Sequence, residues 1–161
     1  MAQFWHQAEM ASAHQRAAQM LAAAADLLDQ GQILNRLSIA VTAIAIAILL
    51  LPMLPPSEAT LPTAALVAVF GFAELMIAMR VGLDAALFRR LANDAAGERL
   101  DVAAFDAAML ALKLMSAGKA GQPIAKRFAG ARRLLIVQGA TLFLQVAAAI
   151  AGGSAIYFNW A

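Results

Sequence analysis

A single carboxylate, Glu74, lies inside a long apolar stretch, in the run "GFAELMIAMR". Acids inside apolar membrane segments are rare and usually mark ion or proton pathways. Burial in apolar surroundings favours the neutral form of a carboxylic acid, which can then donate a hydrogen bond. The residue type therefore predicts either an ion pathway or a buried hydrogen-bonded cluster, and both interpretations stay open at this point.

Two other apolar segments each carry three polar residues at spacings of three and then four, which places each set on one helix face. The sets are Asn35, Ser38 and Thr42, and Gln138, Thr141 and Gln145. Hydroxyls at such positions can bond to carbonyls of their own helix, whereas glutamine amides need partners from elsewhere. The predicted ion pathway or polar cluster comprises Glu74, Gln138, Thr42, Thr141 and Gln145.

Three apolar runs carry these polar residues, except Asn35, which lies two residues before the first. The runs are Leu37 to Leu54, Leu61 to Met79 and Leu134 to Phe158. The chain is 63% hydrophobic and 14% charged, whereas soluble domains are about half apolar and a quarter charged. A bilayer core needs roughly 20 apolar residues in a helix. The sequence predicts an all-α integral membrane protein of one domain (1–161), with transmembrane helices at 35–54, 62–80 and 134–158.

Most of the 12 Lys and Arg residues lie between Arg80 and Arg133, whereas the connection at 55–61 carries only the acid Glu58. Because basic loops stay in the cytoplasm, the N-terminus is predicted inside and the C-terminus outside, with cytoplasmic segments at 1–34 and 81–133 and an external hairpin at 55–61. Tyr157, Phe158 and Trp160 suit an aromatic anchor at the outer interface. A plasma or inner membrane is the expected location. In this arrangement Glu74 and Thr42 both lie about 9 Å from the cytoplasmic edge.

The two cytoplasmic segments are predicted to form a helical bundle. Spacings of three and four in the N-terminal segment indicate a packed seam, formed by Met10, Ala13, Ala17, Met20, Ala24 and Leu27. Asp101 suits the N-cap of a further helix, with Val102, Phe105, Met109 and Leu112 on one face. Pro123 suits the start of a last helix that runs unbroken into the third span.

A basic cluster, "KRFAGARR", directly precedes the third span and contains Lys126, Arg127, Arg132 and Arg133. These cations predict contact with anionic lipid headgroups, at about 1 kcal/mol each. Nucleic acid is not an expected partner, because the chain has no binding motif and only Phe128 interleaves the cations. Within the third span, Ala148 and Gly152, and Ala149 and Gly153, are pairs of small residues that let a helix approach closely. That neighbour can be a span of the same chain or of another copy.

The residues needed for several kinds of chemistry are missing. Without cysteine there is no disulfide, thiolate nucleophile or iron–sulfur cluster. His6 and His14 are the only histidines; neither lies in a predicted span, and together they make a poor metal site. No phosphate-binding loop or hydrolase motif occurs. The sequence therefore predicts a protein that is not an enzyme and that holds neither metal nor cofactor.

Two functions remain. The first is a small self-assembling membrane protein, an oligomeric ion-conducting pore regulated through its cytoplasmic helices, in which Glu74 and Gln138 line or gate the pathway. The second is a non-catalytic scaffold or accessory subunit that binds a protein partner through its amphipathic cytoplasmic helices, while the polar residues fix helix packing. A solute carrier is disfavoured, because no inverted repeat or broken helix is visible.

Overall fold

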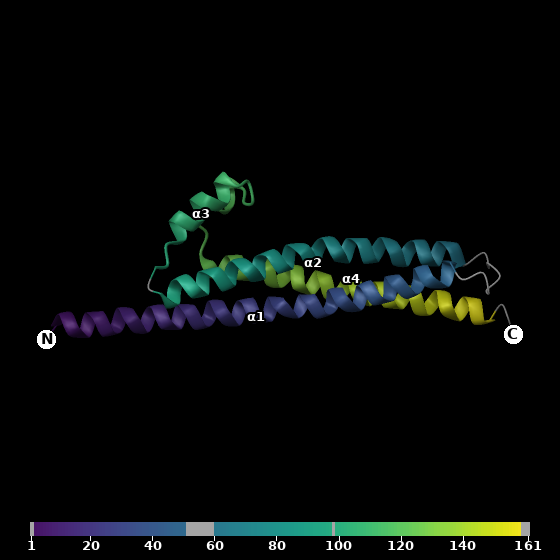
Figure 1. Cartoon of the computed structure of the whole chain (residues 1–161), viewed down its shortest axis with the longest axis horizontal. Helices are drawn as coiled ribbons and strands as arrows, with labels where there is room; N and C mark the ends of the chain where they lie inside the picture. The colour runs from purple at the N-terminus through teal and green to yellow at the C-terminus, as the bar shows by residue number, and fades with distance from the viewer. Residues whose placement is uncertain (1, 51–59, 98, 159–161) are drawn as a thin grey trace. The chain divides into compact units, whose positions relative to one another are not determined.

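The computed structural model describes residues 2–50, 60–97 and 99–158. Within them the chain forms four α-helices, α1 (Ala2–Leu50), α2 (Thr60–Ala96), α3 (Val102–Ala111) and α4 (Ile124–Phe158), and a short 3-10 helix at Ala117–Lys119 (Figure 1). No strand occurs among these residues. The predicted all-α class is confirmed.

The first helix, α1, runs without interruption through residue 34, where a cytoplasmic segment was predicted to give way to a span. Its sequence explains this continuity, because alanine and leucine predominate, both good helix formers, and the first proline of the chain is Pro52. Three predicted features lie outside the described residues. They are the end of the first span (51–54), most of the hairpin (55–59) and the side chains of the aromatic anchor.

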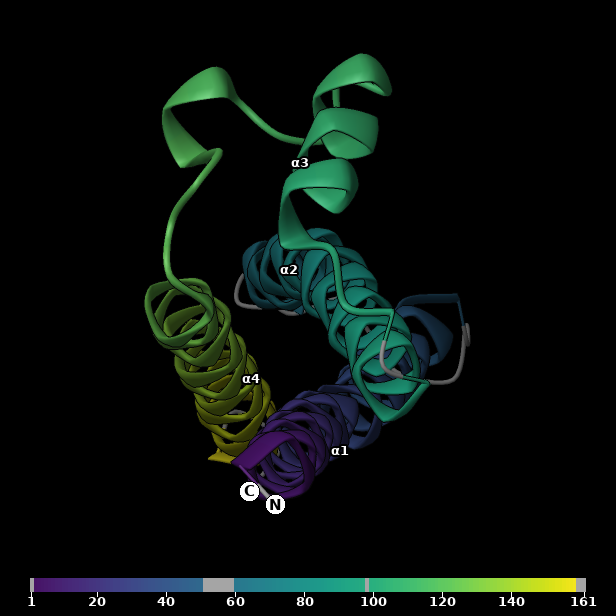
Figure 2. The same ribbon diagram turned by 90° about the vertical axis from the view of Figure 1, so that its left-hand side faces the viewer.

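The remaining helix ends follow local signals. The Asp101 carboxylate accepts a hydrogen bond of 2.9 Å from the Ala104 N–H, which confirms the predicted N-cap of α3. Figure 2 shows the ribbon of α3. Leu112 lies beyond the end of α3 and is 67% exposed, so its predicted place on the packed face is wrong. Helix α4 starts directly after Pro123, whose carbonyl accepts from the Lys126 N–H at 3.0 Å, and it continues to Phe158.

The chain divides into two compact units, each described by itself. Unit 1 comprises Met1–Leu28 and Leu83–Arg132, and unit 2 comprises Asp29–Gly82 and Arg133–Ala161. The core of unit 1 contains Leu21 and Leu28 from α1 and Phe88 from α2. The ring of Phe88 meets that of Phe128 edge to face, with centroids 6.0 Å apart.

The core of unit 1 corrects the predicted seam of α1. Its buried residues are Leu21, Ala24, Ala25 and Leu28. Met10, Met20 and Leu27 are 50%, 72% and 41% exposed, so of the large residues assigned to the packed face none is buried. The packed side of α1 is therefore rotated from the predicted seam and shares only Ala24 with it.

In unit 2 the helices α1 and α4 keep a constant register. Gln138 bonds to Gly31 and Ser38 bonds to Gln145, and both pairs are 107 residues apart, so α1 and α4 run parallel. Helix α2 runs antiparallel to α4. Near the start of α2, Thr63 packs against Gly152, and further along α2, Glu74 bonds to Gln138, which comes earlier in α4 than Gly152. Partners recur every seven residues, as in a coiled coil.

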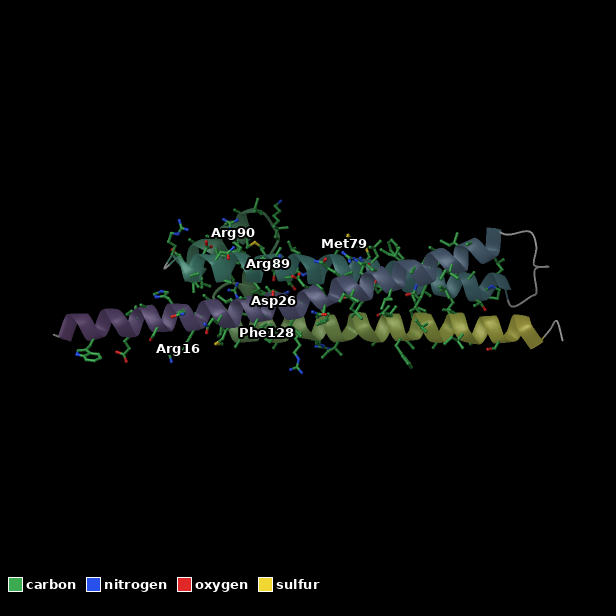
Figure 3. The ribbon with its side chains drawn as sticks, turned by 60° about the horizontal axis from the view of Figure 1, so that its bottom comes forward. Arg16, Asp26, Met79, Arg89, Arg90 and Phe128 are labelled. Carbon is green, nitrogen blue, oxygen red and sulfur yellow. The ribbon has the colours of Figure 1, made fainter. Side chains whose placement is uncertain are left out.

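Unit 2 buries several polar side chains and exposes many large apolar ones. Its fully buried side chains include Glu74, Gln138 and Gln145, whereas Phe72 is 66% and Phe143 71% exposed. Met79, labelled in Figure 3, is 55% exposed. Soluble proteins bury large apolar residues and expose charged ones, so this distribution is the reverse of the usual one.

Two helical stretches are long and apolar enough to cross a membrane, Leu61–Ala96 and Ile124–Ser154, with mean hydropathies of 1.9 and 2.0. Only 22% and 11% of their most apolar windows are buried, whereas the core helix of a soluble protein would be mostly buried. The first stretch contains the second predicted span (62–80), and the second contains most of the third predicted span (134–158). The described part of α1 is not among them.

Candidate functional site

Three polar side chains from two helices form a hydrogen-bonded cluster in unit 2, the Gln145 layer (Ser38, Thr42 and Gln145). The Ser38 hydroxyl donates to Gln145 Oε1 at 2.6 Å. Gln145 Nε2 donates to Thr42 Oγ1 at 2.7 Å and to the Ser38 carbonyl at 3.2 Å. Thr42 in turn donates to that same carbonyl at 2.9 Å. Both polar atoms of the Gln145 amide are therefore satisfied, so this layer is closed.

A second cluster, the Glu74 layer (Gly31, Glu74 and Gln138), lies two helical turns away along α4. Gln138 Nε2 donates to the Gly31 carbonyl and to Glu74 Oε1, both at 2.7 Å. Glycine is needed at position 31 because a Cβ there would lie 2.7 Å from Gln138 Oε1 and 2.9 Å from Val81 Cγ1. All three helices of unit 2 thus meet at this layer.

In the Glu74 layer, some of the hydrogen-bond acceptors have no partner within the described part of the chain. Glu74 Oε2 and Gln138 Oε1 are buried and have no hydrogen-bond partner among the described residues. The same is true of Oδ1 of Asn35, one helical turn after Gly31 on α1. A buried polar atom without a partner costs roughly 1–3 kcal/mol. All three atoms are oxygens that accept hydrogen bonds, and none is a donor.

The structure brings four of the five predicted cluster residues into these two layers. Glu74 lies with Gln138, and Thr42 lies with Gln145. Thr141 is buried as well, but its hydroxyl donates to the Val137 carbonyl of its own helix at 2.9 Å. Ser38, which shared a predicted face with Thr42, also bonds to Gln145 of α4, through its hydroxyl and its carbonyl.

The predicted lipid-contact cluster divides in the structure. Lys126, Arg132 and Arg133 are exposed on α4. Arg127 instead forms a two-pronged ion pair with Asp106 of α3, in which Nη1 and Nη2 each donate to one carboxylate oxygen at 2.6 Å. Its guanidinium is therefore already committed within unit 1.

Asp106 holds the connection between α3 and α4 in place. Its carboxylate also accepts from the Gly121 N–H at 2.8 Å, where Gly121 has a positive φ of 70° that glycine adopts without strain. Hydrogen bonds from the Arg127 guanidinium, helped by the Gly121 N–H and the guanidinium charge, lower the pKa of Asp106 although burial opposes them. Sequence reasoning missed this acid, because nothing in the local pattern links positions 106 and 127.

Five of the six predicted seam residues are not buried in unit 1, whereas the sixth, Ala24, is buried. These five, here called the exposed seam, are Met10, Ala13, Ala17, Met20 and Leu27. Three of these residues are large, and their exposures of 41–72% show that unit 1 does not cover them. A separate cleft in unit 1 is lined mainly by alanine, and its lining includes Ala11, His14, Ala18, Ala92 and Ala95. The His14 ring is bonded to the Met10 carbonyl at 3.0 Å.

Comparisons with protein families, curated proteins and solved structures found no match to this chain. Its function therefore has to be inferred from the polar layers and the exposed seam.

Proposed function

We propose that the chain is a non-catalytic membrane scaffold or accessory subunit that binds the helix of a partner protein through the exposed seam. One observation carries the proposal. In unit 1 the core uses Leu21, Ala24, Ala25 and Leu28 of α1, whereas the large apolar residues Met10, Met20 and Leu27 of the same helix are exposed. An apolar stripe with regular spacing of three and four serves packing against another helix.

The exposed seam offers enough apolar surface for a stable contact. Met20 is 72% exposed, Met10 50% and Leu27 41%. Complete burial of a side chain of this size stabilises by about 1.5–3 kcal/mol. The alanines between them, Ala13 and Ala17, let a helix backbone approach closely, and the flexible methionines adapt to its shape.

Unit 2 serves in this proposal as the anchor, with three spans, the N-terminus inside and the C-terminus outside. Its apolar exterior supports placement in lipid, and the described end of α1 shares that exterior through Ile39, Ile44 and Ile46, which are 45–61% exposed. The concentration of Lys and Arg between residues 80 and 133 supports the orientation. Lys126, Arg132 and Arg133 are free to meet anionic headgroups.

An ion-conducting pore is the second candidate, because the Glu74 layer holds two buried oxygens without partners and Asn35 holds a third. It ranks second on geometry. A path between copies must be lined by side chains on the outside of each copy, yet Glu74, Gln138 and Gln145 are 0% exposed. The pore predicts cation flux in reconstituted liposomes that Glu74→Gln abolishes; equal flux with and without this substitution would exclude Glu74 from the path.

Photo-cross-linking tests the exposed seam directly. A photoreactive amino acid at Met10, introduced in the full chain in its native membrane, is expected to give one discrete adduct. Adding Met20→Glu is expected to reduce that adduct at least tenfold, because a charge is then buried at the contact. The matched control, Gln19→Glu, places the same charge on a neighbouring exposed position and should leave the adduct unchanged.

The mass of the adduct identifies the occupant. A heavier protein supports the accessory role, whereas twice the mass of this chain means that a second copy covers the exposed seam. No adduct from position 10, or an adduct that persists with Met20→Glu, would contradict the proposal.

A further inference from the structure

We propose that α3 and the tip that follows it (112–119) dock on the anionic surface of the bilayer that holds unit 2. The proposal starts from the composition of α3. All of its exposed residues are alanines, namely Ala103, Ala104, Ala107, Ala108 and Ala111. The exposed face of a surface helix normally carries charged and polar side chains, and a helix that is apolar all round is normally buried. The outer face of α3 is therefore apolar and uncovered.

The tip adds large apolar side chains and lysines to this face. Leu112 and Leu114 are 67% and 43% exposed. Lys113, between them, has a φ of 55° and is exposed. Lys119, at the end of the 3-10 helix, is exposed as well. This combination suits a membrane interface, where leucines enter the acyl boundary and lysines meet lipid phosphates.

The charge of this region identifies its partner as anionic lipid. Asp106 is the last acid of the sequence, and its carboxylate is paired with Arg127. The other charged residues between positions 107 and 133 are all exposed cations: Lys113, Lys119, Lys126, Arg132 and Arg133. Asp101, the exposed acid that precedes Asp106, caps the opposite end of α3. An apolar face flanked by cations alone is complementary to a negatively charged leaflet.

The ion pair between Asp106 and Arg127 holds α3 within reach of the bilayer. In the proposed function the third span begins directly after Arg133. Arg127 lies six residues before Arg133 on the continuous helix α4, which is about 9 Å at 1.5 Å per residue. The headgroup layer is about 5–8 Å thick, and a helix with its side chains is about 10 Å across. At the level of Arg127, α3 therefore reaches the headgroups.

This inference rests on the placement of unit 2 in lipid but needs no partner at the exposed seam. The chain has no cysteine, so Ala107→Cys accepts a single spin label on the outer face of α3. The labelled full chain is placed in nanodiscs of phosphatidylcholine, alone or in an equimolar mixture with phosphatidylglycerol. Molecular oxygen concentrates in lipid and a nickel chelate stays in water, so their collisions with the label report its surroundings. A label at Phe143→Cys, where the side chain is 71% exposed, tests the placement of unit 2 separately.

In the mixture, the label at position 107 is expected to collide with oxygen and to be protected from the nickel chelate. In phosphatidylcholine alone it should be accessible to the chelate. Lys113→Glu is expected to shift the equilibrium between protected and accessible label at least about fivefold, which corresponds to the loss of about 1 kcal/mol from one cation. The matched control, Arg16→Glu, makes the same change of charge at an exposed position of α1 and should leave the equilibrium unchanged.

Two kinds of result would overturn the proposal. Access of the nickel chelate to a label at position 143 would remove unit 2 from lipid, and the docking of α3 with it. With position 143 in lipid, docking is excluded if position 107 is accessible to the chelate in the mixture. It is also excluded if the protection is equal in both lipids or persists with Lys113→Glu, since a protein surface would then cover α3. The cross-link at Met10 is independent of all these outcomes.

Discussion

Gly152→Ala is expected to lower the free energy of unfolding by about 1–3 kcal/mol, whereas Gly153→Ala should leave it unchanged or raise it slightly. The reason is the contact between α4 and α2 in unit 2. A Cβ at position 152 would overlap the side chain of Thr63, including its Cβ, which rotation cannot move away. A Cβ at position 153 meets nothing within 4 Å.

The two glycines make a sharp comparison because they are adjacent in one helix and undergo the same chemical change. Alanine favours a helix over glycine by up to about 1 kcal/mol, so this contribution is shared, and the difference between the variants reports the helix contact alone. Thermal unfolding in detergent followed by circular dichroism measures it. Equal unfolding temperatures for the two variants would mean that α2 is not the neighbour of Gly152.

Asp106→Asn is expected to lower the free energy of unfolding of unit 1 by about 2–3 kcal/mol, the range for hydrogen bonds to charged groups. The substitution removes the charge that faces Arg127 and turns an acceptor atom into an N–H₂ group that points at another donor. Asp106 and Arg127 have side chains only 7% and 16% exposed, so water replaces the lost contacts poorly. Asp26→Asn, at an exposed position of α1 labelled in Figure 3, is the control and should change little.

The same ion pair predicts how stability depends on pH. Because the pKa of Asp106 is lowered in the folded chain, the unfolded chain binds a proton at a higher pH than the folded one. The contribution of the pair is therefore complete above the ordinary carboxyl pKa of about 4. It is lost as the pH falls below that value through the lowered pKa. Unfolding of Asp106→Asn should lack this part of the acid dependence; an identical acid profile in both chains would contradict the assignment.

Much of the helical layout could be predicted from local patterns. Asp101 caps α3, and Pro123 precedes α4, because a cap or a proline acts on backbone groups within a few residues. The spacing of Ser38 and Thr42, and of Gln138 and Gln145, placed them on single helix faces. Their contacts across helices agree with those faces.

The exposed seam could not be recognised as exposed from its spacing. Met10, Met20 and Leu27 repeat at the intervals of a packed face, and so do Leu21 and Leu28. Periodicity shows that a face is apolar, but it does not say which helix covers it. That choice depends on the side chains of α2 and α3, which are distant in sequence.

The sequence by itself determined the helices, their apolar character and the polar positions within them, since each follows from interactions over one or two helical turns. Only the tertiary structure decided that Arg127 pairs with Asp106, that Gln145 is satisfied and that Gln138 is not. Those outcomes depend on distances of a few ångströms between segments that are 21 to 107 residues apart. The register of the packed helices sets those distances.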